Sequence, residues 1–584
     1  MPKGVTKEKF ADFVKYYDPD IFRAAGRQIR DMARAADTLA PMERVKRIAA
    51  IFSYFRNPDK ETVLTPWRVV NMHISDCLGG YDFFDETHDA EKGLLSEPRF
   101  VDNGEVTTRV FADPDTRILE INSKTGLYPL YMAYSVFREK CRRYRDANTL
   151  TTDLPDAVQI QLWDETIAQN VFVICKTPMA KSITRRTLRG FRQVKVNTRY
   201  FEDLINQIQN KPKQFIERIS NGKSYWKANK QTFMTFNAIV GNPPYQLTVA
   251  MKDTDNGQKA VINIFHYFQI IADSLRPHYS SFIYPGGRWI HRSGKGLAEF
   301  GLQQINDIHL RLVEFFPNAG SVFKDASIAD GISIVTKDYN KKKTGFMFVY
   351  DHRDPIYTPN PGEELIPLNP DDRIIVSHIE EYVSKLGLSF LHGAILPRSL
   401  FSIESDFVEK NPTLVREYNN GDSFDTKREI KLYTNDKAGK SGRARWYVAN
   451  RSVINTGLEY LDDWKVIVSS ANAGGQKRSN QIAILDNHSA FGRSRVALKT
   501  FKTEQEARNF YIYAKSELIR FAFLLTDESL TSLAKLVPDI QDYSNNNGHI
   551  DFSGDIDAQL YQLFDLTDPV IQKHIREVLA SKAE

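Results

Sequence analysis

The chain has 584 residues, of which 42% are hydrophobic and 26% are charged. Both fractions are those of ordinary globular proteins, so they exclude a disordered, collagen-like or coiled-coil chain, and the length suggests roughly three or four domains. Lysine and arginine exceed aspartate and glutamate by five (78 minus 73), an excess that is too small to identify a binding partner.

The cysteine content and the apolar pattern indicate the compartment. The cysteines are Cys77, Cys141 and Cys175, too few for a disulfide framework, which favours a reducing environment. No histidine or cysteine spacing typical of a zinc site occurs, so no metal is expected. The charged start has no apolar core of a signal peptide, and the longest uncharged stretch, 231–251, is interrupted by Gly241 and two prolines. We therefore expect a cytoplasmic protein without a membrane segment.

The first 61 residues have apolar side chains at helical spacing, as in the run Val45, Ile48, Phe52 after Pro41. This pattern predicts an N-terminal helical segment that caps the next domain. Between about 117 and 340, short apolar runs alternate with helical patterns. The predicted strands are 117–121, 171–175, 236–241, 281–284, 310–315 and 331–336, with helices over 127–143 and 259–275. Such alternation predicts an α/β fold with a doubly wound, mostly parallel sheet, which binds ligands at the carboxyl ends of its strands.

Five prolines stand in the 23 residues from Asp351 to Arg373, which predicts a linker over 351–373. A mixed α/β region, 374–584, follows it, with helices predicted over 504–525 and 568–579. The predicted organisation is therefore a helical segment (1–61), a sheet domain (62–350), the linker, and a C-terminal domain.

The motif that carries chemistry is Asn242-Pro243-Pro244-Tyr245, which leaves the predicted strand through Gly241. Two successive prolines stiffen the loop and remove two backbone donors, so the Asn242 side-chain oxygen and the Pro243 carbonyl can accept two hydrogen bonds from one amino group. Tyr245 offers an aromatic face on which a planar base can stack. These groups suit an amine attached to an aromatic ring, whose lone pair they would free for attack on an electrophilic methyl group.

This strand and motif resemble the catalytic segment of S-adenosylmethionine-dependent adenine-N6 DNA methyltransferases, as in type II restriction–modification systems. The order of motifs resembles the family's gamma arrangement, with cofactor motifs first, catalysis next and target recognition last. The resemblance implies a Rossmann-like class I methyltransferase domain that binds duplex DNA and flips one adenine out of it. It also implies that Tyr245 and Phe323 sandwich that adenine, and that the biological role is host-DNA protection or phage defence.

The resemblance implies cofactor contacts at positions matching the family's other motifs. These are Thr65, Pro66, Glu120, Asn122, Ser123, Gly126 and Asn197. The chain departs from the family pattern in two places. Lys124 stands where the family has the first glycine of its loop, and the segment after the second strand, Cys175-Lys176-Thr177, has no acid for the ribose hydroxyls.

Basic segments predict where DNA is held. In 427–451, eight basic residues stand against two acids, with aromatic residues between them, and 470–478 adds a glycine-containing basic loop. The predicted DNA-binding residues are Lys437, Lys440, Arg443, Arg445, Lys477 and Arg478. They make 374–584 the predicted target-recognition domain. A second basic stretch, 178–200, fits either a solvated helix face, a phosphate contact, or docking to an acidic partner.

Two other functions remain open on the sequence. Related loops accept other planar amines, so an RNA or protein-glutamine methyltransferase is one alternative. The other is a catalytically decayed DNA-binding specificity scaffold, which Lys124 and the missing ribose acid favour. A restriction nuclease or helicase partner is also compatible with the resemblance.

Overall fold

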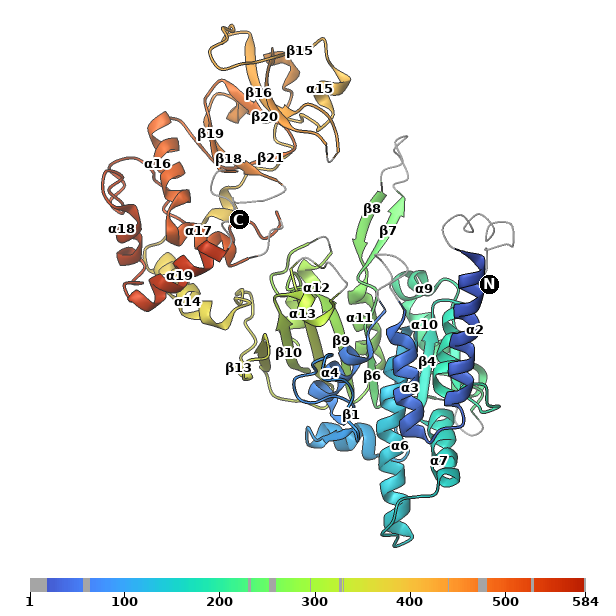
Figure 1. Cartoon of the computed structure of the whole chain (residues 1–584). Coiled ribbons are helices and arrows are strands. Elements are labelled where there is room, and N and C mark those ends of the chain that lie inside the picture. Colours follow the sequence, from blue (N-terminus) through green and yellow to red (C-terminus); the bar gives the residue numbers. More distant parts are fainter. Residues whose placement is uncertain are drawn as a thin grey trace. The chain divides into compact units, whose positions relative to one another are not determined.

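The computed structural model describes residues 18–55, 64–228, 233–250, 259–294, 296–324, 328, 330–439, 441–470, 481–526 and 530–581 (Figure 1). The chain forms two compact units. Unit 1 comprises Met1–Gly287 and Leu302–Gly362, and unit 2 comprises Arg288–Gly301 and Glu363–Glu584. The boundary at Gly362 lies inside the predicted linker. The segment Arg288–Gly301 belongs to unit 2, which a division of the sequence into consecutive domains does not anticipate.

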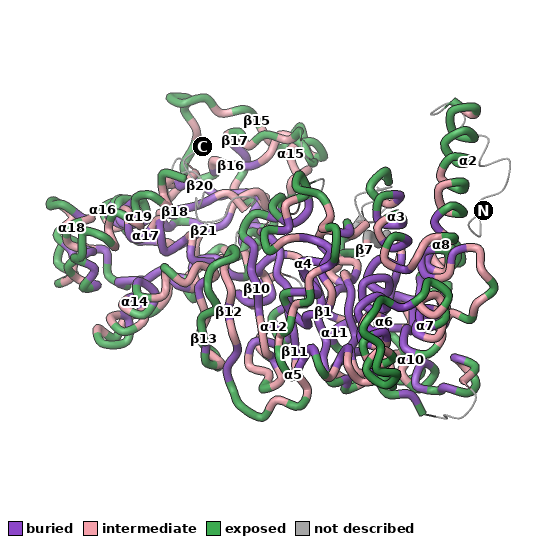
Figure 2. The backbone as a smooth tube through the Cα atoms, turned by 60° about the horizontal axis from the view of Figure 1, so that its bottom comes forward, coloured by how far each residue is buried: buried purple, intermediate pink, exposed green. Residues whose placement is uncertain are grey.

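The first described helices of unit 1 have a proline in their first turn, and an aspartate caps one of them. Helix α2 (Pro19–Ala36) has Asp18 as its N-cap, whose side chain accepts hydrogen bonds from two backbone N–H groups of the first turn. Helix α3 (Pro41–Ser53) has its proline in the first turn, and α4 (Trp67–Leu78) follows. Figure 2 shows that α2 is exposed along most of its length, whereas α4 is almost wholly buried.

A nine-stranded sheet forms the centre of unit 1, in the order β13-β12-β10-β11-β9-β6-β3-β4-β5. Its strands are β3 (Ile118–Ser123), β4 (Val171–Cys175), β5 (Asn197–Tyr200), β6 (Ala238–Gly241), β9 (Tyr279–Pro285), β10 (Leu310–Phe316), β11 (Ile332–Asp338), β12 (Phe346–Tyr350) and β13 (Ile356–Thr358). The five strands from β9 to β5 are parallel, and β11 is antiparallel to both its neighbours. The strand order reverses between β3 and β6, which is the place where doubly wound sheets bind ligands. The predicted mixed α/β fold with a mostly parallel sheet is thus confirmed.

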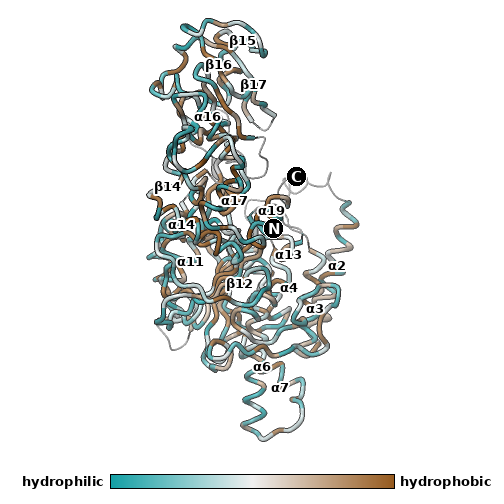
Figure 3. The backbone as a smooth tube through the Cα atoms, turned by 90° about the vertical axis from the view of Figure 1, so that its left-hand side faces the viewer, coloured by the Kyte–Doolittle hydropathy of each residue, from teal (hydrophilic) through white to brown (hydrophobic). Residues whose placement is uncertain are grey.

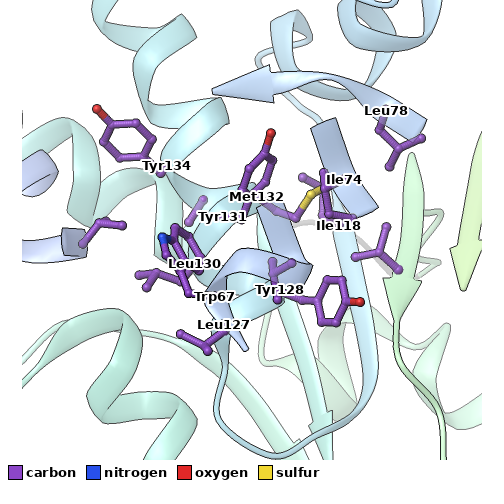
Figure 4. Close-up of a cluster of buried hydrophobic side chains, with 14 of the residues drawn as sticks. Trp67, Ile74, Leu78, Ile118, Leu127, Tyr128, Leu130, Tyr131, Met132 and Tyr134 are labelled. Carbon is purple, nitrogen blue, oxygen red and sulfur yellow. The ribbon is translucent and has the colours of Figure 1, made fainter. Parts of the chain in front are cut away.

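Helices connect the parallel strands and bury apolar side chains against them. They are α6 (Leu127–Ala147), α7 (Asp156–Gln169), α8 (Pro178–Arg189), α9 (Leu204–Asn210), α10 (Pro212–Ile219) and α11 (Phe265–Leu275). The short helix α13 (Ala319–Val322) lies between the antiparallel strands β10 and β11. Figure 4 shows part of this core, where Trp67 of α4 and Ile118 of β3 lie with Leu130 and Tyr131 of α6. This packing attaches α4, and with it the preceding Thr65, to the first strand of the sheet.

One predicted helix is wrong over its first turns. Residues 259–275 were expected to be helical, but Lys259–Asn263 form strand β8, which pairs with β7 (Gln246–Ala250), and α11 starts only at Phe265. The β-branched pair Val261 and Ile262 favours an extended backbone once a partner strand is available. The hairpin starts directly after Tyr245, whose carbonyl accepts a hydrogen bond from the Ile264 N–H at 3.0 Å.

Unit 2 contains two small sheets and a group of helices. One sheet has the order β15 (Val415–Glu417), β17 (Ala444–Asn450), β16 (Glu429–Asn435), β20 (Ser489–Phe491), and the other β19 (Ala483–Leu485), β18 (Trp464–Ser469), β21 (Arg495–Phe501). The main helices are α14 (Arg373–Lys385), α16 (Glu504–Lys515), α17 (Glu517–Leu524), α18 (Ile556–Leu563) and α19 (Pro569–Ser581). Figure 3 shows hydrophobic stretches along α17 in this unit and along β12 in unit 1.

Two further predictions change in detail. The helix expected over 504–525 is broken at Ser516, whose extended backbone separates α16 from α17 and whose hydroxyl donates to the Tyr513 carbonyl. The linker predicted over 351–373 is partly ordered, because Ile356–Thr358 pairs with β12 as the edge strand of the sheet. Within the described ranges, no helix is long and apolar enough to cross a membrane.

Candidate active site

The loop Gly241–Tyr245 lies at the carboxyl end of β6, beside the reversal of strand order. The Asn242 side chain donates a hydrogen bond from Nδ2 to Thr65 Oγ1 at 3.1 Å. Thr65 stands just before α4, 177 positions away in the sequence. The core around α4 therefore orients the catalytic candidate from outside its own loop.

Asn242 Oδ1 and the Tyr245 hydroxyl are both buried atoms. They lie near each other, and the Asn242 amide slightly offsets the burial that raises the pKa of Tyr245 well above its usual range. Neither atom makes a hydrogen bond of good geometry within the described residues. A buried acceptor without a partner is costly, so Asn242 Oδ1 is prepared to accept a hydrogen bond from a ligand.

Glu120 lies on the neighbouring strand β3, opposite Val240 of β6. Burial raises the pKa of its carboxyl group to about 8, although Ser123 and Lys124 both lower it. Its Oε2 atom is buried and has no hydrogen-bond partner in the described structure. A carboxylate in this position would be stabilised by a cationic ligand.

The turn from β3 to α6 approaches α8 closely. Asn122 has φ +74° and Gly126 has φ +82°, both in the left-handed region. Ser123 Oγ is 3.3 Å from Thr184 Oγ1, and a Cβ atom on Gly126 would lie 3.1 Å from the Thr184 Cα. Only glycine fits this approach without strain, although Lys124 interrupts the family's glycine pattern.

A cavity of about 430 Å³ lies next to the loop, and Thr65, Pro66 and Phe323 are among its lining residues. Arg68, in the first turn of α4, donates from Nη2 to the carbonyls of Ser321 and Val322 at 3.0 and 2.6 Å. This guanidinium therefore holds the segment that leads into Phe323, whose ring is buried. No local sequence pattern marks Arg68, because its partners are backbone carbonyls about 250 positions away.

A buried hydrogen-bond network around His73 likewise has no local signal in the sequence. His73 is bonded through Nδ1 to the Tyr128 hydroxyl at 2.7 Å and through Nε2 to Ser281 Oγ at 2.8 Å. Burial lowers the pKa of His73 to about 3, so the ring is neutral at physiological pH. It connects α4, α6 and β9.

The structure does not bring Asn197 to this site. Asn197 starts β5 opposite Phe172, near the amino end of β4, and its Nδ2 donates to the carbonyls of Ala168 and Val171 at 2.9 and 3.2 Å. Asn197 thus lies at the amino end of its strand, whereas Gly241 lies at the carboxyl end of β6. Asp203 follows the carboxyl end of β5, and its Oδ2 accepts a hydrogen bond from Asn206.

Residues 169–323 match the family model of the Eco57I restriction-modification methylase. The match runs from the start of β4 to Phe323 and contains the Gly241–Tyr245 loop. This segment is a restriction-modification methylase domain. The gamma-type resemblance inferred from the motifs is thereby confirmed, and the methylase domain lies in unit 1 apart from Arg288–Gly301.

Three of the solved structures that are similar to this chain are the following. The Type IIL restriction-modification enzyme MmeI in complex with DNA has 11% identity and a TM-score of 0.43, over 92% of this chain and 78% of that one. The DrdV–DNA complex has 10% identity and a TM-score of 0.38, over 99% and 64%. A type I methyltransferase subunit from Streptococcus thermophilus has 12% identity and a TM-score of 0.26, over 52% of each chain. No curated protein matches the sequence.

The predicted DNA-binding residues lie outside the methylase domain, in unit 2. Lys437 is exposed, and Arg445 is ion-paired with Glu417 and Asp436 at 3.4 and 3.7 Å. Arg443 lines a depression of about 690 Å³ together with Arg495 and other polar residues. Lys440, Lys477 and Arg478 lie outside the described residues.

In the described part of the chain, no group of three His, Cys, Asp or Glu side chains could hold a metal ion.

Proposed function

We propose that this chain transfers a methyl group from S-adenosylmethionine to the N6 amine of an adenine in duplex DNA, as the modification activity of a restriction–modification or phage-defence system. The observation that carries the proposal is the Asn242 side chain. Thr65 holds its Nδ2, and its buried Oδ1 has no partner of good geometry. This arrangement matches an incoming amino group.

The loop would activate the amine by accepting its two hydrogens. Asn242 Oδ1 and the Pro243 carbonyl are the acceptors, and the two prolines contribute no competing N–H group. With both hydrogens held, the nitrogen lone pair is less delocalised into the ring and points at the methyl group. Holding both reactants in line can supply several kcal/mol of the barrier. Tyr245 and Phe323 would stack on the two faces of the adenine, offsetting the few kcal/mol that unstacking costs.

The residues around β3 fit the cofactor in part. When bound, S-adenosylmethionine supplies an electrophilic methyl group on a positively charged sulfonium. Glu120, whose buried Oε2 has no described partner, suits the positive charge of such a ligand, and the turn containing Asn122 and Gly126 would approach its polar part. Cys175 ends β4 where a ribose-binding acid is expected, and burial raises the pKa of its thiol to about 12. The ribose is thus held by other groups or more weakly.

We also propose that unit 2 recognises the target sequence, with Lys437, Arg443 and Arg445 among its DNA contacts. We further propose a restriction nuclease or a helicase as a partner of the chain in such a system.

The test is transfer of labelled methyl from S-adenosylmethionine to mixed genomic DNA. We expect label in N6-methyladenine with the wild type and none with Asn242→Ala. Asn340→Ala, which replaces an exposed asparagine of the same unit, should retain full activity. Label that appears only in RNA or protein would favour the other planar-amine substrates. An absence of both label and cofactor binding would contradict the enzyme and leave a DNA-binding scaffold.

A further inference from the structure

Two basic helices of unit 1 meet at their carboxyl ends. On α2, Arg27, Arg30 and Arg34 recur at intervals of three and four residues, so they lie along one side of the helix. Helix α8 carries four basic residues and no acid. We define the α2–α8 surface by Arg27, Arg30, Arg34, Lys181, Arg185, Arg186 and Arg189. Figure 2 shows α8 next to the lower end of α2.

A single aromatic ring joins the two helices. The guanidinium carbon of Arg186 lies 3.9 Å from the centre of the Phe191 ring, and that of Arg34 lies 5.3 Å from it. Two positive charges from different helices are thus held around one ring, whose face attracts each of them. They repel each other across a short distance, and the fold tolerates this repulsion.

Backbone contacts keep the helices in this arrangement. Asp37, just after α2, accepts a hydrogen bond from the Phe191 N–H at 2.7 Å. Arg44 of α3 donates to the carbonyls of Thr187 and Arg186 at 3.0 and 3.1 Å. The end of α2 is therefore fixed against the end of α8, and the arginines are not brought together by side-chain flexibility alone.

The part of the chain that the structure describes offers this surface no neutralising carboxylate. Within the described residues, none of its seven members forms an ion pair with an acid, although Asp20 and Asp31 lie on α2 itself. The carboxylate of Asp164 forms an ion pair with Arg192, with 2.6 Å between Oδ1 and Nη1. Burial lowers the pKa of Lys181 and of Arg189, and the adjacent arginines lower both further. Mutual repulsion of this kind is relieved by a bound polyanion.

The surface starts at the edge of the sheet that holds the candidate active site. Helix α8 follows β4, and β4 is separated from β6 only by β3. With neighbouring strands about 4.8 Å apart, the first turn of α8 begins roughly 10 Å from the Asn242 loop across the sheet. Figure 1 shows the amino end of α2 on the side of the sheet from which β7 and β8 extend.

We propose that the α2–α8 surface binds the phosphate backbone of duplex DNA beside the target base, as a second contact separate from the recognition residues of unit 2. This proposal rests on the proposed function. Duplex DNA carries about one charge per 1.7 Å of axis, so each 10 Å of duplex carries about six charges on its two strands together. Arg27 and Arg34 are seven positions apart in the helix, which is a similar length of about 10 Å at 1.5 Å per residue.

The test compares salt dependence of duplex binding, measured by fluorescence anisotropy with a labelled 40-base-pair duplex. In Arg30→Gln/Arg34→Gln/Arg185→Gln we expect weaker binding to all sequences alike. The slope of log K against log salt should fall by about 0.9 for each lost phosphate contact, or by about 2.7 in total. The control is Arg142→Gln/Arg145→Gln, whose arginines are already ion-paired with acids, and it should keep the wild-type slope.

A second variant and the binding of the wild type separate failure of this proposal from failure of folding or of the proposed function. A second variant, Arg27→Gln/Arg30→Gln, changes only exposed positions of α2 and should lower the slope by about 1.8 if the first variant does not fold. A wild-type slope in both variants would overturn the proposal and leave an acidic protein as the occupant of the surface. If the wild type itself does not bind duplex DNA, the proposed function fails as well, so the two failures are distinguishable.

Discussion

The contribution of the hydrogen bond between Asn242 and Thr65 to the methylation rate can be measured by replacing Thr65. We expect Thr65→Ala to slow single-turnover methylation about tenfold, because a partly buried amide that loses its partner costs roughly 1–3 kcal/mol. Thr65→Ser keeps the hydroxyl group and should stay within about twofold of the wild type. Equal rates for the alanine and serine variants would show that Thr65 does not orient Asn242.

The carboxyl group of Glu120 predicts a pH dependence of stability. Burial raises its pKa to about 8 in the folded chain, whereas the unfolded chain ionises near 4.5. Between these values the unfolded state loses a proton that the folded state keeps, so Glu120 destabilises the fold increasingly as the pH rises.

Glu120→Gln should therefore stabilise unit 1 little at pH 4.5 and most at pH 8 and above. The gain can grow by at most about 1.4 kcal/mol per pH unit. Urea unfolding across this pH range measures it. A gain that does not change with pH would mean that Glu120 is ionised in the folded chain.

At the scale of elements, the β3–α6 turn requires a glycine for two separate reasons. Gly126 has φ +82°, and a Cβ atom there would be too close to Thr184. Gly93 has a similar φ of +75° but nothing within 4 Å of its added Cβ. We expect Gly93→Ala to cost about 1 kcal/mol through backbone strain. Gly126→Ala should cost clearly more and weaken cofactor binding. Thermal melting and calorimetry measure both effects, and equal costs would exclude the steric contribution.

The elements that the sequence predicts well are those whose pattern is local. Strands β3, β4 and β6 are short apolar runs buried on both faces, and such runs are visible without any alignment. Residues 259–263 were misassigned because their extended form depends on pairing with β7, which only the folded chain supplies. The interruption at Ser516 likewise depends on how α16 and α17 pack.

At the scale of the whole molecule, the two units have separate hydrophobic cores, so we expect two unfolding transitions in calorimetry. Phe510→Ala, which empties a fully buried position of unit 2, should lower only one transition, by roughly 3–5 kcal/mol. Gly126→Ala should lower only the other. A single transition that both substitutions shift together would mean that the units unfold as one.

The sequence by itself determined the α/β class, the strand before the motif and the Asn242–Tyr245 loop, because these depend on neighbouring residues and on two adjacent prolines. The tertiary structure decided which distant groups meet that loop. Thr65 contacts Asn242 and Arg68 holds the turn before Phe323, whereas Asn197 lies at the amino end of its strand. It also decided that Arg34 and Arg186 share one ring. Contacts between residues far apart in the chain depend on packing and register, which local patterns do not encode.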